Sequence, residues 1–352
     1  MNKYFFPCPD FESNNSLKKL CLQVLCVLAM FMVCFSQENN DFYDNTPEKA
    51  LAGALKIEVA GEVANPGFVD LGGLPRRSLI VREARLEKGA IAFIGSYRYD
   101  GYSLFDILKE KVVAKKNQAE FRSIIDLLVA VENAKGEKVI LSWGEIYYPS
   151  ALHRVIIADR VAPIIPSETK ENWPLPEAAK LVCGDDLVSE RNLGAPTRIT
   201  VFSAPLSLPG KKGQKPLYAA NFQVTPAGGQ TVAFDPAWFG QLRVYPAVFY
   251  GRGKGFHGIE QFIGCPLKDA LKNFFTFDSA TLQRGYMVVG SVDGYRVALT
   301  CSELFNRNDQ AEFLLIDRGQ GQDGGRYALF PAPDFFSDRA VKAVGAIHFL
   351  TY

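Results

Sequence analysis

The segment of this chain best suited to chemistry is residues 251–258, which reads Gly-Arg-Gly-Lys-Gly-Phe-His-Gly. It follows an apolar run, residues 244–250, that is typical of a strand. Flexible glycines can wrap backbone amides around a phosphate, and Arg252, Lys254 and His257 would add cationic donors. The pattern predicts an anion or phosphate loop. A mobile basic loop without a ligand is the competing interpretation.

Three cysteines, Cys183, Cys265 and Cys301, follow the N-terminal region of the chain. An odd number without close spacing predicts neither a disulfide framework nor a zinc site. Cys265 and Cys301 are candidate ligands or reactive thiols, with small core filling as the competing interpretation. No Ser-His-Asp or paired-carboxylate arrangement stands out, so no residue is assigned a catalytic role.

An internal repeat in the sequence predicts the elements that position these residues. Residues 99–108 and 262–271 both read aromatic-x-Gly-x-x-Leu-x-Asp-x-Leu, a pattern that predicts the start of a helix. Further matched pairs follow in the same order: Ser142-x-x-Glu145 with Thr300-x-x-Glu303, Asp159-Arg160 with Asp317-Arg318, and Asp186 and Arg191 with Asp334 and Arg339. The Ser/Thr-x-x-Glu pairs predict capping boxes, and the acid–arginine pairs predict ion pairs. This shared order predicts two copies of one domain.

Length and composition agree with two domains. The chain has 352 residues, of which 48% are hydrophobic, enough for two cores. Its net charge of +1 comes from intermixed acids and bases, which disfavours nucleic acid and anionic lipid as general partners. The predicted domains are residues 54–203 and 216–352, joined by a linker at 204–215.

The N-terminal region predicts export. Lys18-Lys19 precede an apolar run, residues 20–35, whose length suits a signal peptide better than a membrane span. We expect a signal peptide at 1–36 and a disordered polar tether at 37–53, with order beginning near Leu55. Lipidation of Cys34 and an uncleaved anchor are the alternatives, so contact with a membrane is expected only through this leader.

The order of parts resembles the sulfite-oxidase-like fold, the oxidoreductase molybdopterin-binding domain family, as two divergent tandem copies. The likeness rests on three sets of residues: Gly61-Glu62-Val63 before Asn65-Pro66-Gly67, the Gly-x-x-Leu-x-Asp-x-Leu helix start, and Val292-Asp293-Gly294-Tyr295 with the later Asp334 and Arg339. The resemblance implies an α+β fold, with mixed β-sheets and short helices in each copy.

Active members of that family hold molybdenum through a dithiolene cofactor and a cysteine thiolate, with Arg, Lys and His at the pterin phosphate. The cysteine expected upstream of the helix start is missing from residues 74–100 and 223–262. The favoured hypothesis is therefore an exported, non-catalytic binding or scaffold module without a cofactor. It would be periplasmic, cell-surface or secreted, and its partner would be a small anionic ligand or a protein.

Two alternatives remain open. One is a molybdopterin-dependent oxidoreductase in which Cys265 is an unusual metal ligand and Arg252, Lys254 and His257 grip the cofactor phosphate. The other is a glycan-binding protein that uses aromatic side chains such as Tyr97. The inserted segment around Trp173 is expected to reach across to the second copy.

Overall fold

The computed structural model describes residues 48–352 except 54–55, 167, 209, 211–212 and 322. The predicted signal peptide, and the predicted tether up to residue 47, lie outside the described residues. Order begins earlier than Leu55, because Lys49–Ala50 form strand β1, which pairs with β8 (Val155–Pro163), and Leu51 is buried. No described helix has the length and apolar character needed to cross a membrane.

The predicted fold class, two tandem α+β domains, was wrong. The protein is mostly β, with 46% strand and 13% helix, and its four small sheets have a four-bladed, propeller-like arrangement. The predicted helix starts are correct, but the helices are short: α2 (Leu104–Lys109) and α4 (Leu267–Ala270) are followed by turns. The apolar spacing continues beyond both helices, to Val112 after α2 and to Leu271 after α4, whereas the backbone does not follow it.

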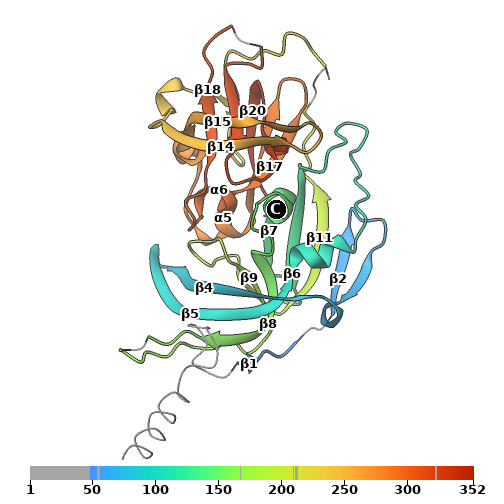
Figure 1. The fold of residues 1–352 in the computed structure, drawn as a ribbon, viewed down its shortest axis with the longest axis vertical. Coiled ribbons are helices and arrows are strands. Elements are labelled where there is room, and N and C mark those ends of the chain that lie inside the picture. Colours follow the sequence, from blue (N-terminus) through green and yellow to red (C-terminus); the bar gives the residue numbers. More distant parts are fainter. Residues whose placement is uncertain (1–47, 54–55, 167, 209, 211–212, 322) are drawn as a thin grey trace, which may run out of the picture. The chain divides into compact units, whose positions relative to one another are not determined.

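The first half, residues 48–203, contains two sheets (Figure 1). One has the order β10-β9-β8-β5-β4, formed by β4 (Arg76–Glu87), β5 (Ala90–Ser103), β8, β9 (Lys180–Cys183) and β10 (Leu193–Gly194). The other has the order β3-β2-β11-β6-β7, formed by β2 (Lys56–Gly61), β3 (Gly67–Asp70), β6 (Leu127–Asn133), β7 (Lys138–Ser142) and β11 (Pro196–Ser203). Within the second sheet, β2 and β11 are parallel and the other pairs antiparallel.

The second half, residues 216–352, contains the corresponding sheets. One has the order β13-β12-β20-β16-β17, formed by β12 (Gln223–Thr225), β13 (Val232–Ala233), β16 (Gly285–Ser291), β17 (Arg296–Thr300) and β20 (Val344–Thr351). The other has the order β14-β15-β18-β19, formed by β14 (Arg243–Gly251), β15 (Gly255–Pro266), β18 (Phe313–Asp317) and β19 (Tyr327–Pro331). In both halves the chain alternates between the two sheets rather than completing one before starting the next.

The remaining helices are also short. They are α3 (Trp143–Tyr147), α5 (Ser279–Arg284) and α6 (Cys301–Phe305), with 3-10 turns at Leu71–Gly73, Pro236–Trp238, Lys272–Phe274 and Ser337–Arg339. The two predicted capping boxes are confirmed: Ser142 and Glu145 cap α3, and Thr300 and Glu303 cap α6. Helix α3 follows directly from β7 and α6 directly from β17, which fixes the position of the first turn of each.

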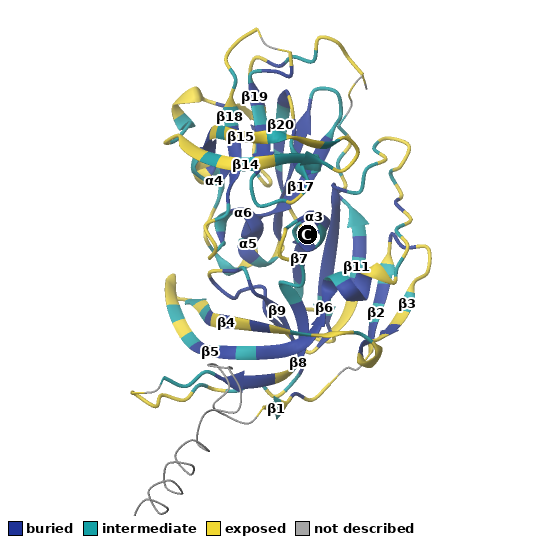
Figure 2. Cartoon of the chain, viewed as in Figure 1, coloured by how far each residue is buried: buried dark blue, intermediate teal, exposed yellow. Residues whose placement is uncertain are grey.

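The two halves share buried surface. Side chains from β6, β7, β16 and β17 form one apolar cluster, which includes Ile140 and Val288. These strands are largely buried, as Figure 2 shows for β6. Ala204, Leu206 and Leu208 pack on the same cluster, so the start of the predicted linker is part of the core. The inserted segment does not reach the second half as expected, because Trp173 stacks edge-on against Phe93.

Candidate functional site

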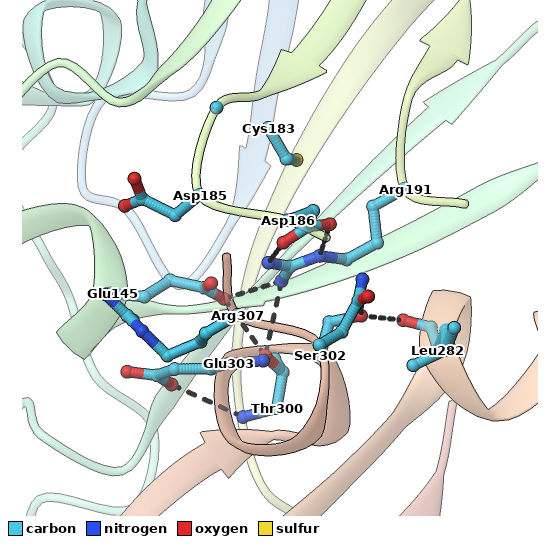
Figure 3. Close-up of polar contacts among 12 residues, drawn as sticks. Glu145, Cys183, Asp185, Asp186, Arg191, Leu282, Thr300, Ser302, Glu303 and Arg307 are labelled. Carbon is cyan, nitrogen blue, oxygen red and sulfur yellow. Dashed lines mark hydrogen bonds and ion pairs between the residues drawn. The ribbon is translucent and has the colours of Figure 1, made fainter. Parts of the chain in front are cut away.

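A buried polar cluster lies where the two halves meet (Figure 3). Arg191 is held bidentately by Asp186, with Nε donating to Oδ2 at 2.9 Å and Nη2 to Oδ1 at 2.7 Å. Its remaining nitrogen, Nη1, donates to Glu145 Oε1 at 3.0 Å and to the hydroxyl of Thr300, in the other half, at 3.2 Å. One guanidinium of the first half therefore contacts both α3 and the cap of α6.

Arg339 makes the corresponding contacts from the second half. Its Nη2 and Nε donate to Asp334 at 2.6 and 2.7 Å, and its Nη1 donates to Glu303 Oε1 at 2.6 Å. The same Nη1 lies 3.5 Å from Ser142 Oγ of the first half. The ion pairs predicted for Asp186 with Arg191 and for Asp334 with Arg339 are confirmed, but their reach across the interface was not predicted.

The two capping boxes also cross the interface. Ser142 Oγ donates to Glu303 Oε2 at 2.7 Å, and Thr300 Oγ1 donates to Glu145 Oε1 at 3.2 Å. The backbone repeats this exchange: Leu187 N donates to Asn306 O at 2.7 Å, and Phe335 N donates to Tyr148 O at 2.8 Å. Each half thus offers the same groups to the other, as the subunits of a two-fold dimer do.

Burial shifts the ionisation of this cluster. Desolvation raises the pKa of Glu145 to about 7, against the opposing effect of Arg191, and raises the pKa of Asp334 to about 6. The pKa of Asp186 is also raised, again chiefly by burial. The physical cause is that each guanidinium serves two carboxylates in a place that water barely reaches, so full ionisation would leave an excess of negative charge.

A raised carboxyl pKa is a frequent property of general acids and bases, so the cluster is a candidate catalytic site. The cavity beside it, lined by Cys183, Asp186 and Arg307 among others, has a volume of only about 10 Å³. That is space for one water molecule rather than a substrate. With its side chains already bonded to one another, the cluster is better suited to joining the halves than to catalysis.

The predicted anion loop forms the tip of the β14–β15 hairpin, which Figure 2 shows as largely exposed. Gly251 pairs with Gly255 across a tight turn, where Lys254 N donates to Gly251 O at 3.2 Å. Gly255 takes a φ of +78°, so this glycine serves the turn. Arg252, Lys254 and His257 are exposed, and the ring of His257 lies 5.3 Å from that of Phe249.

The predicted metal ligand, Cys265, lies near the other end of β15 and is fully buried. Its Sγ accepts the Gly240 N–H at 3.1 Å and donates to Pro266 O at 3.2 Å, and burial raises the pKa of the thiol. Along an extended strand, the eight residues from His257 to Cys265 span roughly 26 Å. These residues therefore do not fit one pterin cofactor, with its phosphate at the hairpin tip and its metal at Cys265.

The other two cysteines that follow the N-terminal region, Cys183 and Cys301, are likewise buried free thiols. Burial raises the pKa of Cys301 to about 12. Within the part of the chain that the structure describes, no group of three or more His, Cys, Asp or Glu side chains is placed to hold a metal ion. The structure thus brings Arg252, Lys254 and His257 together on one hairpin, and places Cys265 apart from them.

Sequence reasoning also missed a cleft of about 490 Å³ between the halves. Its lining includes Arg85 of β4, Lys138 of β7, Arg284 of α5 and Tyr352. These residues come from segments far apart in the sequence, so no local motif marks them. No protein-family model matches the chain and no curated protein matches it, so the role of these sites rests on their geometry.

Proposed function

We propose that this protein is a non-catalytic binding or scaffold module whose two halves are locked together into a single platform. The observation that carries the proposal is the reciprocal buried network: Arg191 and Arg339 bind the acids and cap hydroxyls that would otherwise be free for chemistry. A network of this kind fixes the relative position of two surfaces, which is what a binding platform requires.

The position of Cys265 supports the same proposal. Its sulfur is hydrogen-bonded to backbone groups inside the core. The Cβ of an alanine at Gly240 would lie only 3.1 Å from this sulfur. Placing a metal ion on this sulfur would require the neighbouring backbone to move. Core filling is therefore the better-supported role for this thiol.

Metal analysis tests the proposal. The mature protein would be purified from a host that makes the molybdenum cofactor, shown to unfold cooperatively, and assayed for molybdenum and for pterin fluorescence after acid release. We expect neither signal. Stoichiometric molybdenum would overturn the proposal; loss of that metal in Cys265→Ser but not in the matched buried-thiol variant Cys301→Ser would then assign the ligand.

Export is part of the proposal and rests on the apolar run at residues 20–35. We expect the mature protein, recovered from outside the cytoplasm, to begin at Gln37. N-terminal sequencing and intact mass measure this directly. A protein retained in the cytoplasm with residues 1–36 intact would contradict it, and a lipid-modified mass beginning at Cys34 would select the lipid anchor instead.

A further inference from the structure

The interface between the halves has two equivalent positions. At one of them, here called the filled place, side chains of the protein pair with one another. Arg296, the first residue of β17, donates from Nε to Asp126 Oδ2 at 3.1 Å, and both side chains are buried. Lys115 Nζ lies 2.6 Å from the other oxygen of Asp126. The linker residue Leu208 covers this place, where its N–H donates to Glu120 at 3.0 Å. Charge is balanced here by groups of the protein itself.

Strand register identifies the second place. Lys138 is the first residue of β7, as Arg296 is of β17, and Arg284 directly precedes β16, as Asp126 directly precedes β6. Both Lys138 and Arg284 line the 490 Å³ cleft, and helix α5, which ends at Arg284, packs beside β7 (Figure 1). The filled place therefore has an arginine and an aspartate at these two positions, whereas the cleft has a cation at both.

The remaining lining offsets this positive charge only in part. Arg284 makes no ion pair with any described residue, and Lys138 is paired only with the partly exposed Glu132, at 3.1 Å. The cleft also contains Arg85 and two acids. Both acids already accept hydrogen bonds: Glu190 from Leu86 N at 2.7 Å, and Glu137 from the side chain of Asn133 at 2.6 Å.

We propose that this cleft binds a small anion bearing phosphate or carboxylate groups, which bridges Lys138 and Arg284 as Asp126 bridges its cations at the filled place. Guanidinium groups bind such oxyanions bidentately, and the stacking of Lys138 Nζ over the Tyr352 ring, at 5.4 Å, holds the ammonium at the cleft. The inference rests on the proposed binding function and names its ligand class.

Calorimetric titration of the full mature protein tests this site, with inorganic pyrophosphate and citrate as probes and potassium chloride at matched ionic strength as the blank. Binding of pyrophosphate alone assigns a phosphate ligand, and binding of citrate alone a carboxylate. The informative variant is Arg284→Asp, which restores the charge pattern of the filled place. It should weaken binding roughly tenfold or more, because charge-assisted hydrogen bonds are lost.

Two further variants make the result decisive. Lys138→Gln should also weaken binding while adding no new charge, whereas Arg82→Asp, at an exposed arginine of β4 outside the cleft, should leave it unchanged. If the wild type binds neither probe, or Arg284→Asp binds as tightly as the wild type, the anion site is wrong. Such a failure would leave the molybdenum result untouched, so the two proposals fail separately.

Discussion

At the scale of single residues, the buried arginines determine the behaviour of their neighbours. Arg191 contacts two carboxylates, Asp186 and Glu145, and only Asp186 receives two hydrogen bonds from it. Glu145 is therefore the acid least compensated for its burial, and it is the one whose pKa rises to about 7. A proton on Glu145 removes the excess charge without breaking the paired geometry of Asp186 and Arg191.

This pKa gives stability a definite dependence on pH. Between the ordinary value of 4.5 and about 7, the native state holds a proton on Glu145 that the unfolded chain has released. The stability that this group contributes is therefore fully present below about pH 4.5 and is lost as pH rises through about 7. The loss is up to about 3 kcal/mol of the free energy of unfolding. Glu145→Gln keeps the acceptor oxygen and should remove this dependence, leaving the variant more stable relative to wild type above about pH 7.

Urea unfolding at several pH values measures this difference. The free energies of unfolding of wild type and Glu145→Gln should diverge from about pH 4.5 to about pH 7 and then keep a constant difference. Glu137→Gln, at an exposed glutamate of the same half, should stay parallel to wild type over that range. Parallel curves for Glu145→Gln as well would show that Glu145 ionises normally in the folded protein.

At the scale of elements, α3 depends on a glycine at its second position. A Cβ on Gly144 would lie 2.2 Å from Arg339 Nη1 and 2.5 Å from its Cζ, so the guanidinium occupies the space of a side chain. Arg339 is held by Asp334 and Glu303 and cannot move without breaking buried ion pairs. The matched position in α6 is Ser302, whose hydroxyl instead donates to Leu282 O at 2.9 Å (Figure 3).

Gly144→Ala should therefore destabilise the protein by roughly 1–3 kcal/mol, although alanine has the higher intrinsic helix propensity. Denaturant unfolding at neutral pH measures the change. Gly73→Ala is the matched control, because a Cβ there meets nothing within 4 Å and its φ is not positive. If Gly144→Ala proved as stable as wild type, Arg339 would not pack as closely over α3 as the structure has it.

Local sequence signals predicted the elements that depend on local chemistry. The capping boxes at Ser142 and Thr300 were correct, because cap residues act on backbone groups a few positions away. The predicted helix starts gave no helix length, and α2 ends at Lys109 and α4 at Ala270 although the apolar spacing continues. A periodic pattern shows which side chains are buried, but sheet contacts decide how far a helix extends.

The candidate sites were predictable only in part for a similar reason. Arg191 and Arg339 were expected to pair with nearby acids, and they do, but their contacts with Thr300 and Ser142 come from tertiary packing. The residues of the cleft carry no motif. Comparing Lys138 with Arg296 by strand register would have shown the change of charge, but only once the interface between the copies was known.

At the scale of the whole molecule, the crossed network makes the two halves depend on each other. Arg339 belongs to the second half, yet it contacts Ser142 and packs over α3 of the first, while Arg191 does the reverse with Thr300. Apolar cluster residues from both halves surround this contact, and the start of the linker adds to it. Neither half buries its share of this surface without the other, so we expect wild type to unfold in one transition.

Arg339→Met tests that dependence directly. It leaves Asp334 and Glu303 buried without their cation, and removing one partner of a buried pair costs about 3–5 kcal/mol. Because the network joins both halves, Trp143 of the first and Trp238 of the second should report the same lowered midpoint in variants that each retain that residue as the only one of the chain's three tryptophans. Arg198→Met, at an exposed pair with Glu58, should cost less than about 1 kcal/mol. A lowered midpoint at Trp238 alone would mean that the halves fold separately and that the network does not couple their unfolding.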